Sequence, residues 1–296
     1  MTVKHRRAKI EDKTATVVLY IVAGFFLLLL AAFTIYILYK GVIAYKPGYL
    51  GFRGQGLGKE FFNTIYLVFI SLIITLPIGV CAGIYMAEYA RDNSLTRFLR
   101  TCIETLSSLP SIVVGLFGYL VFLVMTHSHW NLLAGALALS ILNLPLLTTV
   151  TEDAFKALNS SYREGSLGLG ATQWQTITAV LFPAALPRLI TGVIMAAGRG
   201  FGEAAALLFT SGMSSDVNFN NWNPFSITSP LNIFRPADTL AVHIWALKTE
   251  GIDANAAQLS DLSAAVLILM VFAFSLGSRF IGGILERKMT GNSKDR

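Results

Sequence analysis

The chain has 296 residues, of which 54% are hydrophobic and 14% are charged, and its formal net charge is +6. About a quarter of the residues in a soluble domain are charged, so this composition excludes an ordinary soluble enzyme and indicates a protein embedded in a membrane. The charged residues fall in bands separated by long apolar runs, and these runs define the predicted elements.

Apolar runs long enough to cross a bilayer recur along the chain. Residues 14–39 and 61–87 contain no Asp, Glu, Lys or Arg, and the neutral run 105–151 has room for two spans of about 20 residues and a turn. In hydrocarbon every backbone amide and carbonyl must bond within its own segment, so each run is predicted to be helical. We therefore predict an all-α polytopic membrane protein with about six transmembrane helices, at about 16–40, 61–87, 106–126, 131–151, 189–210 and 262–285.

The connections divide the chain into a short N-terminal segment, a transmembrane domain and a tail. The first apolar run is about twice as long as the hydrophobic region of a signal peptide, so we expect a retained helix. We assign residues 1–13 to the N-terminal segment, 14–288 to the transmembrane domain and 289–296 to the tail. Two long connections lie within the domain, at 152–188 and 211–261, and connections of this length are commonly functional.

Lys and Arg are concentrated on one side of the predicted membrane domain. The N-terminal segment, the connection between the second and third spans, the connection 152–188 and the tail hold most of them. Cytoplasmic loops are enriched in Lys and Arg, so we expect these segments and both termini in the cytoplasm, with 211–261 as an outer loop. Topology thus accounts for the net positive charge, and no nucleic-acid partner is expected.

The connection 152–188 contains signals for two short helices. Ser161 and Glu164 have the spacing of a capping box, and Gly170 suits the left-handed position that ends a helix. Thr172 begins a second capping box, and the helix that follows is predicted to end at Pro183, because proline disrupts a helix interior. We therefore expect a cytoplasmic helical hairpin, in which Glu164 serves as a cap, as a contact with another protein, or as both.

Two charged residues, Arg199 and Glu203, lie near the centre of the predicted fifth span. A charge at this depth costs about 2.5–3.5 kcal/mol on insertion scales, so such residues normally face a protein interior or an aqueous path. At a spacing of four they share one helix face and can pair. A guanidinium binds a tetrahedral oxyanion through two parallel hydrogen bonds. A carboxylate can accept a hydrogen bond from the hydroxyl of protonated phosphate, and sulfate has no such hydroxyl at neutral pH. The two residues are therefore part of a substrate pathway or a structural ion pair.

Metal, cofactor and ATP sites are not expected. His127 and His129 lie on a predicted outer turn, and two histidines without a further ligand nearby are too few for a metal site. Gly58 and Lys59 do not complete a phosphate-binding loop, because Arg53 stands where its first glycine is needed. The His-Glu-x-x-His motif of a metalloprotease is also absent from the sequence. These residues favour a transporter over a membrane enzyme.

The spacing of Glu164, Gly170, Val180 and Pro183 resembles the coupling loop of binding-protein-dependent importer permeases. That family has Glu-Ala-Ala, three residues, Gly, nine residues, an aliphatic residue, two residues and Pro. Here the opening triplet is Glu-Gly-Ser, so both alanines are replaced. The resemblance implies a permease whose hairpin fits a groove on a separate ATPase subunit, with Glu164, Gly170 and Pro183 at the family's coupling positions.

Residues 199–210 are similar to the Arg-x-x-Gly-Glu-x-Ala-Pro-Leu-Leu-Phe-Thr segment of phosphate-specific transport permeases of the PstA type. In this chain the segment reads Arg-Gly-Phe-Gly-Glu-Ala-Ala-Ala-Leu-Leu-Phe-Thr. Matches at 108–118 and 143–147 extend the similarity over about 63–285. Ala206 departs from the family's proline, which leaves open whether the helix breaks there.

This resemblance implies a type I ABC importer permease that carries inorganic phosphate inward across the cell membrane of a prokaryote and has no enzyme activity of its own. The implied partners are a homologous PstC-type permease, a PstB-type ATPase dimer and an extracytoplasmic PstS-type phosphate-binding protein. Arg199 and Glu203 then occupy the family's intramembrane charged positions. The alternatives are a permease for another oxyanion and a proton-coupled secondary transporter with Glu203 as the carrier, although such transporters commonly contain an internal repeat.

Overall fold

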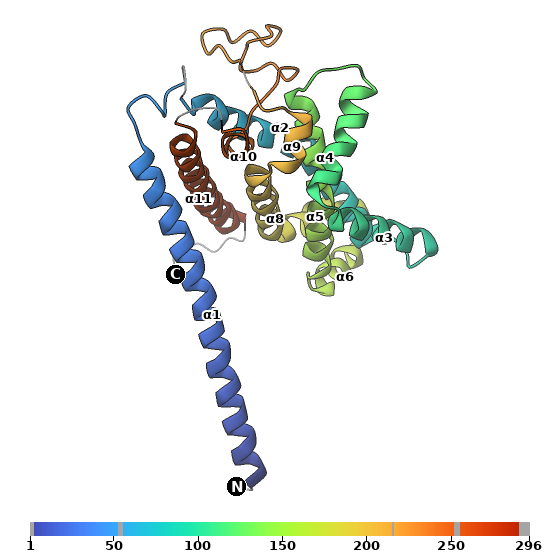
Figure 1. Ribbon diagram of the computed structural model, residues 1–296. Helices are drawn as coiled ribbons and strands as arrows, with labels where there is room; N and C mark the ends of the chain where they lie inside the picture. Colours follow the sequence, from blue (N-terminus) through green and yellow to red (C-terminus); the bar gives the residue numbers. More distant parts are fainter. Residues whose placement is uncertain (1–2, 53–55, 215, 252–254, 290–296) are drawn as a thin grey trace.

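The computed structural model describes residues 3–52, 56–214, 216–251 and 255–289, without the side chains of residues 3–8, 10 and 285–289. Within these residues every regular element is a helix, which confirms the predicted all-α class. Figure 1 shows a bundle of helices with one long helix, α1, extending well beyond it. Several basic residues that support the predicted orientation lie outside the described side chains: Lys4, Arg6, Arg7, Arg287, Lys288, Lys294 and Arg296.

Five helices within the described residues are long and apolar enough to cross a membrane. Three of them lie within single α-helices: Glu11–Ala44 within α1 (Val3–Ala44), the whole of α5 (Leu132–Lys156), and Ala256–Ile284 within α11 (Ala256–Met289). The span Gly58–Tyr89 consists of α2 (Gly58–Ile84) and the π-helical η1 (Tyr85–Tyr89). The span Gln173–Gly202 consists of α7 (Gln173–Thr176), the π-helical η3 (Ile177–Leu181) and α8 (Phe182–Gly202). A sixth span arises when the bent pair Ser94–Ser108 and Ser111–Val124 counts as one. The predicted number of about six therefore depends on a broken helix.

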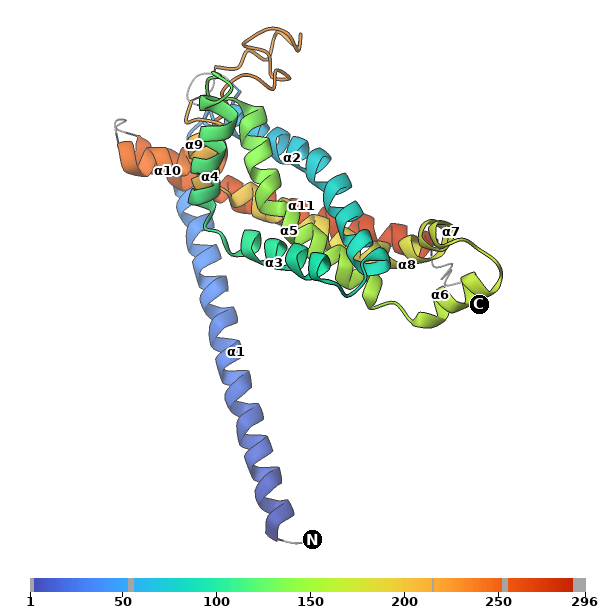
Figure 2. The same ribbon diagram turned by 90° about the vertical axis from the view of Figure 1, so that its right-hand side faces the viewer.

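The third span is broken, contrary to the continuous helix predicted at 106–126. α3 (Ser94–Ser108) ends before Pro110, and α4 (Ser111–Tyr119), continued by the π-helical η2 (Leu120–Val124), leaves at an angle of 99°. Proline pushes the residue before it out of the helical region, and Leu109 accordingly has an extended ψ of 134°. Figure 2 shows the consequence, since α3 crosses the lower part of the bundle instead of running along it.

The central helix of the bundle is α5, which packs mainly against α2 and α8. A Cβ atom on Gly79 of α2 would lie 2.9 Å from the Cβ of Leu147, so glycine permits a close approach of these two helices. The same pair is joined by a buried hydrogen bond, in which the Ser140 hydroxyl donates to the Ser71 carbonyl at 3.2 Å. α2 and α5 therefore form a tightly packed core around which the other helices are arranged.

The long helix α1 stands apart from this core and packs mainly against α11 (Figures 1 and 2). At their crossing Gly41 approaches Ala265 so closely that a side chain on Gly41 would clash with it. No residue in the most apolar stretch of α1 is buried within this single chain. A long uncovered apolar helix indicates contact with lipid or with another subunit.

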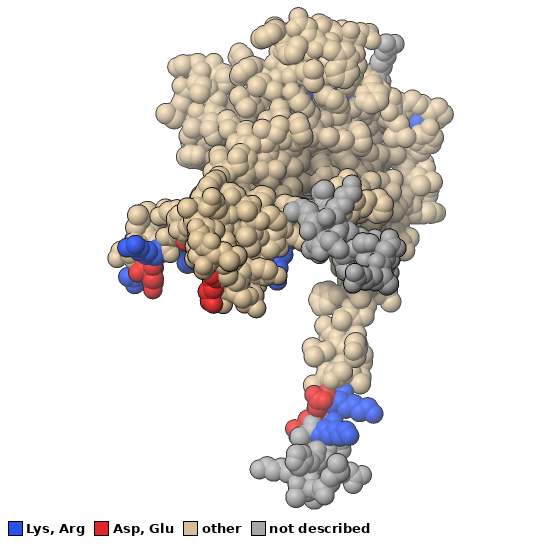
Figure 3. Space-filling model, turned by 180° about the vertical axis from the view of Figure 1, so that it is seen from behind, with Lys and Arg blue, Asp and Glu red and all other residues tan. Residues whose placement is uncertain are grey.

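The two ends of the molecule differ in structure and in charge. Between α9 (Ala205–Thr210) and α10 (Leu240–Glu250) a long, mostly irregular segment covers one end of the bundle (Figure 1). Figure 3 shows charged side chains gathered toward the opposite end and along the projecting part of α1. This is the distribution expected if the irregular segment faces outward and the charged end faces the cytoplasm.

Candidate functional site

The predicted fifth span is interrupted at Glu203. α8 ends at Gly202, Glu203 has extended backbone angles (φ −74°, ψ 121°), and α9 begins at Ala205, so the span predicted at 189–210 does break, which the sequence had left open. The Oε1 atom of Glu203 accepts a hydrogen bond from the amide of Ala206 at 3.1 Å. A proline at this position would lack that amide. The carboxylate therefore supports a break that occurs without the proline usual in the resembling family.

Contacts with α4 hold α9 in place after the break. A Cβ atom on Gly115 would lie 2.7 Å from the Cα of Ala206, and one on Gly118 would lie 2.9 Å from Cγ2 of Thr210. Such short distances leave room for glycine alone, so the two helices approach each other backbone to backbone. α4 and α9 lie side by side in Figures 1 and 2, and the two interrupted spans thus meet at this contact.

Arg199 lies about one turn before the break and is not paired with Glu203. Its side chain is exposed, and its Nη1 donates to the carbonyl of Leu142 on α5 at 3.3 Å. The ion pairs between described side chains do not include one between Arg199 and Glu203. The pairing expected from their spacing does not form, because α8 ends before Glu203 and the carboxylate turns toward α9 instead.

The three glycines around Arg199 face different surroundings. A Cβ atom on Gly200 would meet side chains of α2 and α5 at 3.1–3.2 Å, so this side of α8 is packed in the core. A Cβ atom on Gly198 or Gly202 would meet nothing within 4 Å. Gly198, Arg199 and Gly202 therefore form an open face of α8 next to the break, which this chain leaves uncovered.

The connection between α5 and α8 forms the predicted helical hairpin, but its first cap differs. The N-cap of α6 (Ser160–Gly168) is Asn159, whose Oδ1 accepts from the amide of Ser161 at 3.0 Å, so the capping box predicted for Ser161 and Glu164 is wrong. Asparagine is as good an N-cap as serine, and it comes earlier in the chain. Gly170 has a φ of +86°, as predicted, and Glu164 is exposed on α6.

The second half of the hairpin runs without interruption into α8. Thr172 forms the predicted capping box with Gln175, but Pro183 does not end the helix. The π-helical η3 precedes this proline, and its wider turn removes the carbonyl that the proline ring would otherwise strike. Pro183 therefore lies inside a helix that continues from α7 through η3 into α8, directly after the π-helical turn. The hairpin and the interrupted span are therefore one continuous helical element.

One residue, Glu88 in η1, holds the hairpin against the end of α2 through its carboxylate and its backbone carbonyl. The Nε of Arg163 on α6 donates to Glu88 Oε2 at 3.0 Å, and the Nε2 of Gln173 on α7 donates to the Glu88 carbonyl at 2.8 Å. Hydrogen bonding to Glu88 raises the pKa of Arg163, so the guanidinium stays charged. Leu169 and Trp174 are exposed near the turn of the hairpin. The sequence did not single out Glu88, because its partners come from a distant part of the chain.

A buried guanidinium fixes the outer segment to α2. Arg235 is 1% exposed. Its Nη2 donates to Oδ1 of Asn63 at 2.7 Å and to the carbonyl of Pro230 at 3.0 Å. Its Nε donates to the carbonyl of Ser229 at 3.0 Å. Burial lowers the pKa of Arg235 to about 10, so it is still charged at neutral pH. An arginine in a polar loop is usually exposed, and for this reason the sequence did not predict the role.

Arg235→Ala is expected to destabilise the protein by about 3–5 kcal/mol, because it leaves several buried acceptors without a donor and opens a cavity. Thermal unfolding of the purified chain in detergent measures the effect. Arg235→Lys is expected to restore less than half of the loss, since an ammonium group cannot reproduce the planar fork. Lys248→Ala, at an exposed cation of α10, is the matched control. An unfolding temperature for Arg235→Ala equal to that of the control would contradict this role.

Comparison with known proteins identifies the class to which this arrangement belongs. Residues 79–291, which include the hairpin and the interrupted fifth span, match the family model of the binding-protein-dependent transport system inner membrane component. The chain belongs to this family. Its members are the permease subunits of ABC importers and are not themselves enzymes, so this chain is an ABC importer permease and a multi-span membrane protein.

Individual relatives agree with the family. The probable ABC transporter permease protein YqgI of Bacillus subtilis is 46% identical over 96% of this chain and 99% of its own length. The phosphate transport system permease protein PstA of Xylella fastidiosa is 32% identical over 76% of this chain and 74% of its own length. Among solved structures, a bacterial alginate ABC transporter bound to its periplasmic protein has a chain with a TM-score of 0.64 and 14% identity, covering 95% of this chain and 98% of that one. That similarity shows the importer fold.

Proposed function

We propose that this permease carries inorganic phosphate inward across the cytoplasmic membrane, driven by ATP that a separate subunit hydrolyses. The observation that carries the proposal is the exposed guanidinium of Arg199 on the last turn of α8, followed four residues later by the carboxylate of Glu203 at the break between α8 and α9. A guanidinium binds an oxyanion through two parallel hydrogen bonds. A carboxylate accepts a hydrogen bond from the hydroxyl that phosphate retains at neutral pH and that sulfate lacks. Because the two groups do not pair with each other, neither charge is neutralised by the other before a ligand binds.

The relatives support the same substrate. The PstA protein of X. fastidiosa is named as a phosphate transport permease, and the segment 199–210 of this chain has the PstA-type pattern except at Ala206. The name of YqgI specifies no substrate. The charged groups at the break and the PstA-type pattern around them thus favour phosphate over another oxyanion.

The proposal requires partners on three sides. A homologous PstC-type permease would cover α1 and the open face around Arg199, and the passage would run between the two chains. A PstB-type ATPase dimer would receive the hairpin through Glu164 and the exposed Leu169 and Trp174. Gly170 would shape the turn, and Pro183 would lie in the helix that joins the hairpin to the interrupted span. A PstS-type phosphate-binding protein would deliver substrate at the outer end.

Uptake by vesicles tests the substrate and the energy source together. Vesicles containing this chain with its partner permease, ATPase and binding protein are expected to accumulate labelled phosphate only when ATP is supplied, and excess sulfate is expected to leave the rate unchanged. Uptake driven by a pH gradient without ATP would favour the secondary-transporter alternative. Preferential uptake of sulfate or another oxyanion would overturn phosphate as the substrate.

A further inference from the structure

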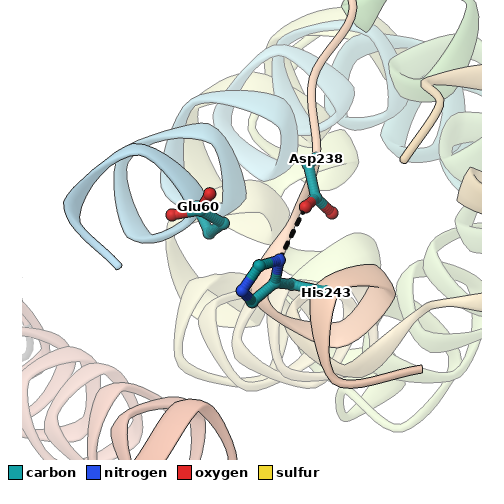
Figure 4. A group of neighbouring side chains, drawn as sticks. All are labelled: Glu60, Asp238 and His243. Atoms are coloured by element: carbon teal, nitrogen blue, oxygen red, sulfur yellow. Dashed lines mark hydrogen bonds and ion pairs between the residues drawn. The ribbon is translucent and has the colours of Figure 1, made fainter. Parts of the chain in front are cut away.

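Three titratable side chains gather at the outer end of the bundle, away from the proposed pathway. Glu60 lies in the first turn of α2, Asp238 lies just before α10, and His243 lies in the first turns of α10 (Figure 4). One donor atom from each residue lies within 4.8 Å of the donor atoms from the other two. The Nδ1 of His243 is 2.9 Å from Oδ2 of Asp238. This group of three is called the outer triad below.

The outer triad is buried and its polar atoms are incompletely satisfied. Glu60 and Asp238 are 6% and 3% exposed, respectively. Within the described residues, Oε2 of Glu60, Oδ1 of Asp238 and Nε2 of His243 have no hydrogen-bond partner, and no Lys or Arg forms an ion pair with either carboxylate. Burial raises the pKa of Asp238 to about 6, partly offset by its hydrogen bond with His243. Two buried carboxylates whose one ion-pair partner among the described residues is a histidine, and whose remaining oxygens are unpartnered, are costly, so the triad has the character of an incomplete site.

We propose that Glu60, Asp238 and His243 bind one divalent transition-metal ion, of which Zn²⁺ is the best example. Two carboxylates and an imidazole are a ligand set that Zn²⁺ accepts, and two negative charges with a neutral histidine match a charge of +2. Two ligands on a tetrahedral ion with bonds of about 2.1 Å lie about 3.4 Å apart. The 2.9 Å between His243 and Asp238 is close to that separation, and the ligand atoms of all three residues lie within 4.8 Å of one another, so binding the ion requires side-chain rotations that bring them together.

The surroundings favour an ion at this position. The ligands come from rigid elements, since Glu60 is on α2 and His243 is on α10, and Asp238 lies between the anchored Arg235 and the capping residue Thr239. The side chain of His243 is 17% exposed, which gives access from the outer face. Three protein ligands leave one position for water. An ion held here joins the start of α2 to the start of α10.

Zinc binding to the full-length chain, purified in detergent and stripped with a chelator, tests the proposal. One Zn²⁺ per chain is expected by calorimetry, together with a rise in unfolding temperature on adding the ion. His243→Gln and Glu60→Gln are each expected to weaken binding by at least about 100-fold. The matched control is His127→Gln with His129→Gln on the outer turn, which is expected to leave affinity within about twofold of the unmodified chain.

Cobalt provides a measurement that needs no variant. Co²⁺ bound to the unmodified chain is expected to give the visible absorption of a tetrahedral nitrogen and oxygen site, and Zn²⁺ is expected to abolish it. Equal zinc affinity in all variants, or loss of binding in the His127 and His129 control, would overturn the assignment. So would the absence of both stoichiometric zinc binding and the cobalt spectrum in the unmodified chain. Phosphate uptake is not part of the measurement, so failure here leaves the proposed transport function to be judged separately.

Discussion

Arg199→Ala is expected to slow ATP-dependent phosphate uptake by about 10- to 100-fold. Charge-assisted hydrogen bonds are worth about 1.5–3 kcal/mol, and each 1.4 kcal/mol corresponds to a factor of ten. The loss falls on transport and not on folding, because the side chain is exposed and its contact within the chain is a hydrogen bond of 3.3 Å to Leu142. Initial rates of labelled phosphate uptake in reconstituted vesicles measure the change.

Two further variants separate the pathway role of Arg199 from a structural role. Arg199→Lys keeps the charge but not the fork, so it is expected to recover part of the rate. Arg97→Ala removes an exposed arginine of α3 and is expected to transport normally. The amount of assembled complex should be equal in all of them. Wild-type uptake by Arg199→Ala would rule out the pathway role, and a loss confined to assembly would show that Arg199 is structural.

Gly170→Val is expected to lower phosphate-stimulated ATP hydrolysis by about tenfold. The hairpin turns at Gly170 with a φ of +86°, and a left-handed conformation costs an L-residue about 1–2 kcal/mol, more for a β-branched one. Space is not the obstacle, since a Cβ atom there would meet nothing within 4 Å. The strain instead reshapes the turn that is proposed to dock on the ATPase. ATP hydrolysis by the assembled complex, with and without loaded binding protein, measures the coupling.

Matched substitutions nearby isolate the effect of the turn. Gly170→Asn is expected to retain most of the stimulation, because asparagine tolerates the left-handed region. Gly165→Ala lies within α6, where a Cβ atom also meets nothing within 4 Å, and it is expected to be silent. Full stimulation in Gly170→Val would count against the hairpin as the docking element. Impaired stimulation in Gly165→Ala would point to α6 as a whole instead of the turn.

The charge-free runs predicted where helices occur but not where they break. The run 105–151 contains no charge to mark its interruption, and the bend after Ser108 is imposed by Pro110. The break at Glu203 carries no proline at all. It depends on close contact between α4 and α9 at Gly115, and on a hydrogen bond from the amide of Ala206 to Glu203. Such tertiary contacts override a helical pattern that is otherwise continuous.

Some residues of the candidate sites could be predicted from the sequence and others could not. The charge and depth of Arg199 and Glu203 were evident from the sequence, and so was the turn at Gly170, because each depends on local chemistry. The outer triad was not evident from the sequence, since Glu60 is far from Asp238 and His243 along the chain and the three residues do not form a known metal-ligand motif. The sequence directed attention to His127 and His129, which are close in the chain but exposed. Spacing along the chain predicts a ligand set only when the ligands are local.

Glu60 and Glu88 belong to the same helical element, which runs from Gly58 to Tyr89 over 32 residues, or about 48 Å at 1.5 Å per residue. Its outer end carries one member of the outer triad, and its inner end is bonded to both helices of the hairpin through Glu88. A displacement of the hairpin therefore acts directly on the C-terminal end of this helix, at Glu88. The contacts that hold its N-terminal end, at Glu60, determine how far the helix tilts and how far it bends in response.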